Sequence, residues 1–390
     1  MIHFFKRNII NPLSVFIHDS RAIGITLLAC TGFSLVLSNI GTIGELYRAF
    51  WSFSFDGTQN HNAHVGILSL PNSPLLIIND FMMALFFFLA GMEIKREMLH
   101  GELATIKKSL LPIAAAIGGM LIPAILFTQF NRGTEFMQGW AIPTATDIAF
   151  TLGVASLLGN RVPLSLKIFL TALAIIDDLG AILIIALFYG DHIQIGFILL
   201  CGIIIFGLYL LKRYHAKFGA VQWILGFLLW YCMFNSGVHA TVAGVLFAFM
   251  MPEELLVKYE KKFHLPVYFI VIPIFALANT SILFPAKSLQ LLTGSLSWGI
   301  IFGLCIGKPA GIFGTCYYVV KKGFAELPKG INWNKLIGAG LLAGIGFTMS
   351  IFISTLAFKQ PIQTDIAKIS VLIASLIAMS SGYFWLKYKK

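Results

Sequence analysis

The chain is dominated by apolar runs of the length that a helix needs to cross a lipid bilayer. A hydrocarbon core about 30 Å thick takes about 20 predominantly apolar residues in helical form. Only helices and closed barrels satisfy every backbone hydrogen bond in lipid, and runs of this length favour helices. The sequence therefore predicts an all-α polytopic membrane protein, with residues 1–390 forming a single transmembrane domain. Twelve runs are candidate transmembrane helices, near 22–42, 74–94, 109–129, 139–158, 165–188, 193–211, 219–234, 237–251, 265–284, 296–319, 335–357 and 367–386.

Basic residues are distributed unevenly between the loops. The chain has 28 Lys and Arg against 17 Asp and Glu, which gives a formal net charge of +11. Most of the Lys and Arg fall in alternate loops and at the two ends, as the positive-inside rule requires of cytoplasmic segments. Twelve spans with this bias predict that both termini are cytoplasmic. Because the charge follows the topology, no nucleic-acid partner is needed to explain it.

The longest loop on the opposite side covers residues 45–73. It contains two stretches of alternating apolar and polar residues, 51–55 and 64–70, with Asp56-Gly57 between them. Alternation on both sides of Asp-Gly is typical of a small β-hairpin on the outer side of the membrane. A hairpin alone is marginally stable in water, so we expect it to pack on another surface, such as a second copy of the chain. An ordinary exposed loop explains the pattern equally well.

Two adjacent carboxylates, Asp177 and Asp178, stand in the middle of the run at 165–188. An ionisable side chain at the bilayer centre costs about 2.5 to 3.5 kcal/mol, so these acids must be paired or face water, and they indicate a functional site. Successive helical residues point about 100° apart, so one acid can line a cavity while the other faces a neighbouring helix. Lys308 is the only Lys or Arg well inside a run, which makes it the candidate partner. A purely structural ion pair is the alternative.

The run at 139–158 contains residues that interrupt a helix. Pro143 removes a backbone donor and clashes with the preceding turn, and the polar Thr146 and Asp147 can satisfy the backbone groups that a break sets free. We therefore expect an interrupted helix near 143–147. A simple proline kink is the alternative.

The run at 335–357 is the second candidate for an interruption. Its segment 344–350, with the sequence GIGFTMS, combines glycines with hydroxyl residues. Glycine disfavours a continuous helix, so we expect a break there. Close packing of the small residues Gly340 and Gly344 against a neighbouring helix explains the pattern at least as well.

The two interrupted runs are the fourth and the eleventh, and each is the middle of a group of three. An offset of seven spans is odd, so the second group has the opposite orientation in the membrane. Paired interrupted helices in an inverted repeat are the sequence pattern of a secondary transporter's substrate site. Half-helix ends carry about half a charge, positive at N-termini and negative at C-termini. Asp147 can therefore compensate two converging N-termini, and Lys308 two converging C-termini.

Further polar residues lie near the ends of runs and have a simpler explanation. His239 starts the short run at 237–251 and is typical of a histidine that packs with its hydrogen bonds satisfied. Charged residues also cluster at two predicted cytoplasmic helix ends, where most such clusters are solvated caps. These are Glu93, Lys95, Arg96 and Glu97 at one end, and Glu260, Lys261, Lys262 and His264 at the other.

Several segments, in this order along residues 20–386, resemble those of the NhaA-type sodium/proton antiporters. They are Asn79-Asp80, 91–97 (GMEIKRE), 143–147 (PTATD), 174–180 (AIIDDLG), 236–241 (SGVHAT), 307–309 (GKP) and 344–350 (GIGFTMS). NhaA is a known case of the inverted-repeat architecture. The resemblance implies a pH-regulated, multi-pass antiporter of the bacterial inner (plasma) membrane. It would exchange sodium or lithium ions for protons, contribute to sodium and pH homeostasis, and need no cofactor.

The resemblance also implies roles for individual residues. Asp177 and Asp178 are similar to the family's ion-binding and proton-carrying pair, with Asp178 the more direct sodium ligand. Thr146 and Asp147 are similar to the unwound part of the broken fourth helix, where Thr146 adds an oxygen for Na+ and Asp147 compensates the half-helix dipoles. Lys308 resembles the lysine that balances the opposite helix termini and can pair with Asp177.

Other positions are similar to groups that family members use for pH response at the cytoplasmic mouth, namely Glu93, Glu97, His239, Glu260 and His264. The chain departs from the family in two places. Lys261 stands where some relatives have a histidine, and the segment 45–73 is not a clear copy of the hairpin through which the family dimerises. A homodimer is therefore an expectation of the resemblance, while the dimer contact and the pH set-point stay open.

The expected chemistry is competition for oxygen ligands. Sodium and lithium are hard cations that suit carboxylates and the carbonyls of a broken helix. Protons bind the same carboxylates, so a site that opens alternately to the two sides exchanges one ion for the other. Two other functions use buried acids: a passive cation channel, which conducts without obligatory proton movement, and an intramembrane aspartyl protease. The protease needs two carboxylates around one water, whereas the adjacent Asp177 and Asp178 point apart.

Overall fold

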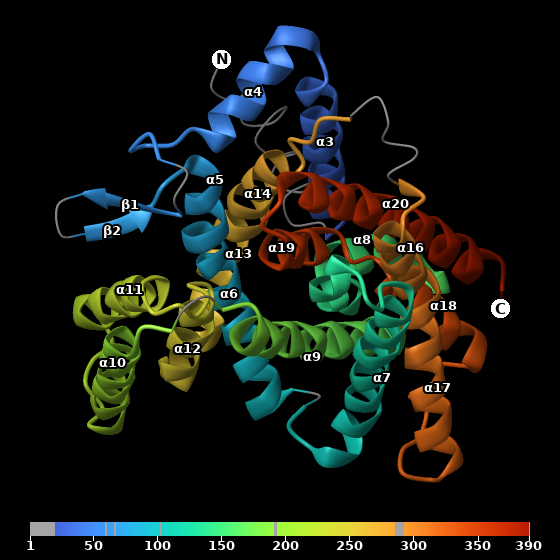
Figure 1. The fold of residues 1–390 in the computed structure, drawn as a ribbon. Helices are drawn as coiled ribbons and strands as arrows, with labels where there is room; N and C mark the ends of the chain where they lie inside the picture. Colours follow the sequence, from blue (N-terminus) through green and yellow to red (C-terminus); the bar gives the residue numbers. More distant parts are fainter. Residues whose placement is uncertain are drawn as a thin grey trace, which may run out of the picture.

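The computed structural model describes residues 20–58, 61–65, 68–101, 103–190, 193–284 and 292–389, and this part of the chain is mainly helical (Figure 1). The helices before residue 190 are α3 (Ser20–Ser38), α4 (Gly41–Ser52), α5 (Pro74–Leu76), α6 (Met83–His100), α7 (Ile106–Phe130), α8 (Ile148–Leu157) and α9 (Leu164–Phe188). Those after it are α10 (Ile195–Arg213), α11 (Ala220–Phe234), α12 (Val242–Met250), α13 (Glu253–Pro266), α14 (Ile272–Asn279), α16 (Ser295–Phe302), α17 (Lys308–Lys321), α18 (Trp333–Ala343), α19 (Phe347–Ala357) and α20 (Pro361–Tyr388).

Segments of other helix types interrupt or extend these helices. Two are 3-10 helices, η3 (Glu135–Thr144) and η4 (Gly159–Arg161), and three are π-helical, η2 (Ile77–Met82), η5 (Val267–Val271) and η6 (Gly303–Gly307). Single π turns inside α-helices are frequent at functional sites. Here η2 contains the buried Asp80, and η6 ends directly before the buried Lys308.

The predicted apolar runs all fall on helical segments. Among the described residues, seven segments are long and apolar enough to cross a membrane: Pro74–His100, Lys108–Phe130, Leu164–Phe188, Ile195–Arg213, Glu253–Asn279, Ser295–Lys321 and Pro361–Tyr388. Two pairs bent at short breaks pass the same test together, α18 with α19 at 45° and α3 with α4 at 117°. The other predicted runs coincide with η3 and α8, with α11 and with α12. The all-α polytopic class is therefore confirmed.

The outer loop predicted at 45–73 differs from the expectation at its start. Its first part is helical, because the chain turns sharply after α3 and continues as α4. The hairpin itself exists, as strands β1 (Asn62–Val65) and β2 (Leu68–Pro71), which pair antiparallel with Val65 opposite Leu68. The small sheet was predicted correctly, but its strands are shorter and lie later in the chain.

The predicted hairpin turn at Asp56-Gly57 is wrong, since both residues precede the sheet. Asp56 Oδ1 accepts hydrogen bonds from the backbone N–H (2.8 Å) and the hydroxyl (2.8 Å) of Thr58, and from Nδ2 of Asn72 (2.7 Å). These bonds, led by those from Thr58, lower the pKa of Asp56 to about 2. Gly57 has φ +74°, which favours glycine. The Asp-Gly pair thus forms a local loop turn with its own hydrogen bonds.

Close helix packing through glycine supports the centre of the molecule. A Cβ atom on Gly118 of α7 would lie 2.3 Å from the carbonyl oxygen of Gly311 on α17, and one on Gly244 of α12 would lie 2.1 Å from that of Ala84 on α6. Such contacts let helix backbones approach closely where lipid supplies no hydrophobic driving force. Helix α9 contacts α6, α7, α8 and α18 and lies at the centre of the assembly (Figure 1).

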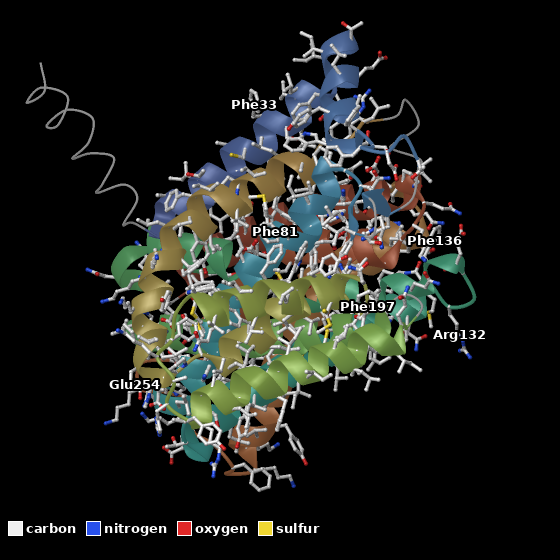
Figure 2. The ribbon with its side chains drawn as sticks, turned by 90° about the vertical axis from the view of Figure 1, so that its left-hand side faces the viewer. Phe33, Phe81, Arg132, Phe136, Phe197 and Glu254 are labelled. Carbon is white, nitrogen blue, oxygen red and sulfur yellow. The ribbon has the colours of Figure 1, made fainter. Side chains whose placement is uncertain are left out.

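Apolar side chains cover the outside of the helices. Only 11% of the apolar window of α10 is buried, and Phe33 on α3, which is 60% exposed, projects from the surface (Figure 2). Arg132 and Glu254 lie at opposite sides of the molecule in the same view. An apolar surface between two charged sides is what a bilayer requires of a spanning protein.

Candidate functional site

Two interrupted helices cross next to α9. After η3 the chain is extended through residues 145–147 and then forms α8, while α18 and α19 are separated by residues 344–346. The backbone N–H of Asp147 donates to the carbonyl of Ile345 across the crossing, over 2.7 Å. Both predicted interruptions are therefore confirmed. The first half-helix is a 3-10 helix containing Pro143, a detail that the sequence did not reveal.

Hydroxyl groups tie the four half-helices together in a reciprocal way. Ser350 Oγ on α19 donates to the carbonyl of Ile142 near the end of η3 (2.7 Å). Thr151 Oγ1 on α8 donates to the carbonyl of Leu342 near the end of α18 (3.1 Å). Each hydroxyl thus adds a hydrogen bond to a carbonyl near the C-terminus of the opposite interrupted helix, and the carbonyl of Leu342 also accepts from the backbone N–H of Ile345 (3.1 Å). This exchange is the relationship expected of two repeats that face each other.

Asp147 caps two helix N-termini at once. Its Oδ1 accepts from the backbone N–H of Phe150 in α8 (3.1 Å). Its Oδ2 accepts from the backbone N–H of Thr348 in α19 (3.1 Å) and from the hydroxyl of the same residue. A carboxylate at this position satisfies free backbone donors and compensates the positive ends of both half-helices.

Lys308 lies on the side of the crossing where the first half-helix ends, so that it faces a negative C-terminus. Its side chain is fully buried, and Nζ lies 2.8 Å from Oδ2 of Asp177. Nζ also donates to the carbonyl of Thr144, the last residue of η3. The pairing with Asp177 is confirmed as a contact. The expectation that Lys308 serves two C-termini is only half met, because the carbonyl of Ala343 at the end of α18 accepts instead from the hydroxyl of Thr146 (3.0 Å).

Asp177 is the acid that faces the crossing. Its Oδ2 accepts from Thr146 Oγ1 (2.6 Å) as well as from Lys308. A threonine hydroxyl has one hydrogen, so Thr146 donates either to Asp177 or to Ala343 at any moment. The other oxygen, Oδ1 of Asp177, is buried and makes no hydrogen bond within the described residues. A buried acceptor without a partner is rare and marks an atom that another group can satisfy.

Asp178 has a different environment from its neighbour. Its side chain is buried, with the residue 5% exposed, and within the described part of the chain no hydrogen bond or ion pair to its carboxylate occurs. The carboxylates of Asp177, Asp147 and Glu93 are close enough to interact with it electrostatically. The two adjacent acids are therefore inequivalent: Asp177 is held by Lys308 and Thr146, whereas the carboxylate of Asp178 has no such partner within the described residues.

The oxygen-rich surroundings suit a hard cation better than a transition metal. Among the described residues, no group of three His, Cys, Asp or Glu side chains converges as a metal cluster. Carboxylate, hydroxyl and backbone carbonyl oxygens from Asp177, Asp178 and Thr146 are present instead. Ions such as sodium are bound by such oxygen ligands, in the manner of other hard cations.

A cavity of about 390 Å³ lies between α6 and α9 on the predicted cytoplasmic side. It is lined by Glu97 of α6 and by Lys167, Thr171 and Ala172 of α9. Ala172 precedes Asp177 by five residues, about 7.5 Å along the helix axis. The cavity therefore ends within two helical turns of the ion-pair site.

The candidate pH-responsive residues do not form one group. Arg96 joins two of them, since its NH1 lies 3.2 Å from Oε1 of Glu97 and its Nε 3.0 Å from Oε2 of Glu260. Glu93 is close enough to interact electrostatically with both Glu97 and Glu260. His264 packs against the ring of Tyr268 with 4.6 Å between ring centroids.

His239 lies elsewhere, in a cavity of about 1020 Å³ on the side predicted to be the outer one. Its Nε2 is 3.6 Å from Oδ1 of Asp80, whose Oδ2 is 3.1 Å from Nε2 of His61. The cavity is also lined by Lys359, which belongs to a predicted outer loop. His239 therefore does not lie with the other candidate pH-responsive residues, and it lies beside Asp80, a buried acid that sequence reasoning noted without assigning it to a site.

Other polar residues near the site were misjudged or missed. Lys95 was interpreted as part of a solvated cap, but it is buried, and its Nζ donates to the carbonyls of Phe249 (2.7 Å) and Met251 at the end of α12. Lys368 on α20 is also buried, although it stands near the edge of a predicted run. The one signal for the missed Thr348 was its place directly after a glycine-rich break, where hydroxyl residues can bind free backbone groups.

Comparisons with known proteins give a consistent result. The family model described as Na+/H+ antiporter 1 matches residues 14–386. A Na+/H+ antiporter NhaA of Flavobacterium psychrophilum is 46% identical over 380 residues, which cover 96% of this chain and 95% of that protein. Antiporters of the same name from Pelagibacter ubique and a Sulfurovum species are 44% and 41% identical, and each comparison covers at least 97% of both chains.

Proposed function

The chain belongs to the Na+/H+ antiporter 1 family, and from this premise we propose that it exchanges sodium or lithium ions for protons across the bacterial inner membrane at Asp177 and Asp178. The observation that carries the proposal is the inequivalence of the two acids. Asp177 contacts Lys308 and Thr146, while the buried carboxylate of Asp178 has no hydrogen bond or ion pair in the described part of the chain. Asp178 is thus available for an ion, whereas Asp177 is paired with the positive charge of Lys308.

Asp178 is the proposed principal ligand of the cation. A cation that loses water needs several oxygen atoms in return. The carboxylate of Asp178, the unbonded Oδ1 of Asp177 and the hydroxyl of Thr146 supply them from α9 and the interrupted helix beside it. Asp147 is not itself a proposed ligand. It supports this arrangement because it fixes the two half-helix N-termini that adjoin the extended segments.

Charge balance is the proposed basis of coupling. Two carboxylates and the ammonium of Lys308 carry one net negative charge in a buried site, which is costly in a low-dielectric interior. Either Na+ or a proton neutralises that charge. Release of the cation therefore favours uptake of at least one proton, and alternate opening toward the two sides turns this competition into exchange.

The two cavities are the proposed access routes. The inner cavity at Glu97 and Lys167 approaches α9 from the cytoplasm, and the outer cavity holds Asp80 and His239. Glu93, Glu97, Glu260 and His264 are the proposed pH-responsive group at the inner side. Arg96 couples two of these acids, so a change in their protonation alters an ion-pair network beside the inner cavity.

We further propose that both termini are cytoplasmic and that the chain forms one transmembrane domain in the lipid bilayer. A homodimer is the proposed assembly, with the outer hairpin of β1 and β2 as a candidate contact. An isolated two-stranded sheet is marginally stable, which favours a partner surface for it. Cross-linking of cysteines introduced singly into β2 tests this contact in intact membranes.

The decisive experiment uses purified protein in vesicles with an imposed pH gradient. Added sodium or lithium should dissipate the gradient in wild type, and Asp178→Asn should abolish the response because the variant lacks the ligand charge. Asp365→Asn, which changes an acid at the start of α20, is the matched control and should keep it. Normal sodium-driven dissipation by Asp178→Asn would refute the assignment.

The same vesicles discriminate against the two rival functions. A passive channel would conduct sodium without moving protons, and an intramembrane protease would cleave peptides without dissipating any gradient. Nothing in the arrangement of the acids favours the protease, because Asp177 is engaged by Lys308 and Thr146 and does not share a site symmetrically with Asp178.

A further inference from the structure

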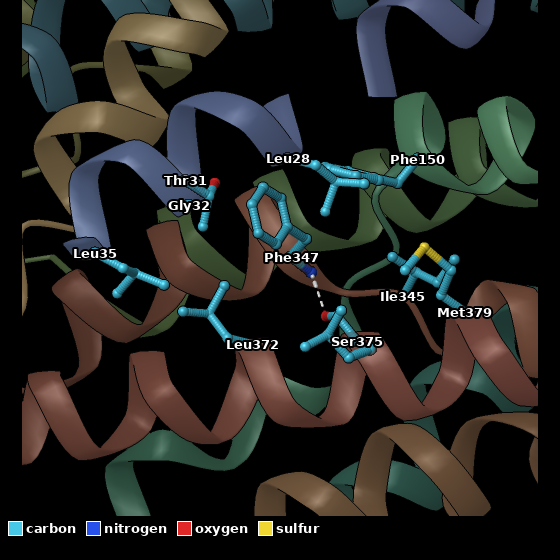
Figure 3. Close-up of a pocket in the computed structure, with 11 residues that line it drawn as sticks. Leu28, Thr31, Gly32, Leu35, Phe150, Ile345, Phe347, Leu372, Ser375 and Met379 are labelled. Atoms are coloured by element: carbon cyan, nitrogen blue, oxygen red, sulfur yellow. Dashed lines mark hydrogen bonds between the residues drawn. The ribbon is translucent and has the colours of Figure 1, made fainter. Parts of the chain in front are cut away.

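A third cavity, of about 190 Å³, lies directly behind the crossing of the interrupted helices (Figure 3). Three parts of the fold line it. One wall is α3, another is the break before α19 together with Phe150 of α8, and the third is α20. Leu28 on α3 and Leu376 on α20 line the cavity and are also exposed on the outside. The cavity therefore reaches the lipid-facing surface between these two helices.

The lining is apolar except for two hydroxyl groups. Ser375 Oγ accepts a hydrogen bond from the backbone N–H of Phe347, the first residue of α19 (3.1 Å, Figure 3). Thr31 is 5% exposed, and its Oγ1 makes no hydrogen bond within the described residues. A buried hydroxyl without a partner is unfavourable, so a ligand that offers Thr31 an acceptor would gain a hydrogen bond there.

The size and chemistry of the cavity define its ligand. An apolar protein cavity of about 150 Å³ is large enough to bind benzene. We propose that this cavity binds a small apolar ring compound carrying one hydrogen-bond acceptor, such as an aryl ketone, which enters from the bilayer between α3 and α20. The ring fills the apolar space, and the carbonyl oxygen accepts from Thr31. A site of this kind selects for the acceptor as well as for the ring.

Such a ligand would touch the crossing itself. Ile345 and Phe347 line the cavity, and the carbonyl of Ile345 accepts from the backbone N–H of Asp147. The rings of Phe150 and Phe347 meet there with 4.5 Å between centroids. A ligand lodged between α3 and the crossing restrains the two relative to each other. The consequence for transport, which rests on the proposed function, is slower sodium/proton exchange.

The binding test is independent of transport. The probe is 4-fluoroacetophenone, observed by fluorine NMR with full-length protein in bicelles. Wild type should show a saturable bound signal. Gly32→Leu, which adds a side chain where a Cβ meets no atom within 4 Å on the cavity rim, should lose it. Gly202→Leu, at an equally open and exposed site on α10, is the control and should keep it. Equal binding by both variants would overturn the site.

The acceptor is tested with Thr31→Val and a matched hydrocarbon, 4-fluoroethylbenzene. The variant should weaken ketone binding about fivefold, the factor of one neutral hydrogen bond, and leave hydrocarbon binding unchanged. If the hydrocarbon binds wild type as tightly as the ketone, the acceptor requirement is wrong, and a lipid acyl chain becomes the better occupant.

The exchange test then separates the two proposals. The ketone should slow gradient dissipation by wild type and Gly202→Leu vesicles, relative to each variant's own rate, but not by Gly32→Leu vesicles. Saturable binding with no effect on exchange would overturn the coupling to the crossing. Saturable binding in a protein that shows no sodium-driven exchange at all would instead refute the proposed function and leave the ligand site standing.

Discussion

Replacing Lys308 by Met retains most of the side-chain volume and removes the ammonium group that pairs with Asp177. In wild type this group is fully buried, lies 2.8 Å from Oδ2 of Asp177, and also donates to the carbonyl of Thr144. Removing one partner of a buried ion pair costs about 3 to 5 kcal/mol, because the other charge is left uncompensated. We expect Lys308→Met to lower the free energy of unfolding, measured by denaturant titration in mixed micelles, by about that amount.

A double-mutant cycle isolates the ion pair from other effects of the substitution. Asp177→Asn alone leaves the ammonium buried without its carboxylate and should also destabilise the protein. In the double variant neither charge remains, so its loss should be smaller than the sum of the two single losses by a coupling energy of about 2 to 3 kcal/mol. Lys368→Met, at a buried lysine for which the described residues provide no salt bridge, should cost less. Strictly additive losses would refute the reasoning.

Three further predictions concern the crossing and the outer loop. Asp147→Asn should lower the free energy of unfolding by about 1 to 2 kcal/mol in the same titration, because two helix N-termini lose their compensating charge. Ser350→Ala should cost about 1 kcal/mol through the lost bond to Ile142, whereas Ser381→Ala, which breaks a bond within one helix, should cost less. Because the pKa of Asp56 is lowered to about 2, its hydrogen bonds stabilise the loop above about pH 4 and are lost as pH falls toward 2. The protection factor of the Thr58 N–H, which is the hydrogen-exchange rate of an unstructured peptide divided by its own rate at the same pH, should fall over that window, and a constant protection factor would contradict the assignment.

The membrane architecture follows from the sequence because its causes are local. Apolar length fixes a spanning helix, and a proline or a glycine cluster within such a length indicates a break, as at Pro143 and Gly344. The pairing of Lys308 with one of the two acids also follows, since a charge buried in lipid requires a partner and few are available, whereas the choice of Asp177 was implied by the family resemblance. These features depend on the cost of leaving a polar group in hydrocarbon, which holds in almost any fold.

Features that depend on tertiary packing were not predictable. Asp-Gly is a strong turn signal, but Asp56 satisfies its oxygen with the adjacent Thr58, so the turn formed outside the hairpin. Lys95 looked like a surface residue because its sequence neighbours are charged, whereas α12 ends against it and offers two carbonyls. His239 lies in the cavity with Asp80 and Lys359, because it stands at the start of its short run and not at its end.

The reciprocal hydrogen bonds of Ser350 and Thr151 hold the two interrupted helices together at their crossing. With Asp147 bonded to both half-helix N-termini, η3, α8, α18 and α19 are linked at their meeting point by side chains from both repeats. One of these half-helices cannot move away from the others without breaking these hydrogen bonds. We therefore expect access to the acids to change by movement of these four half-helices together against the surrounding helices, including α3.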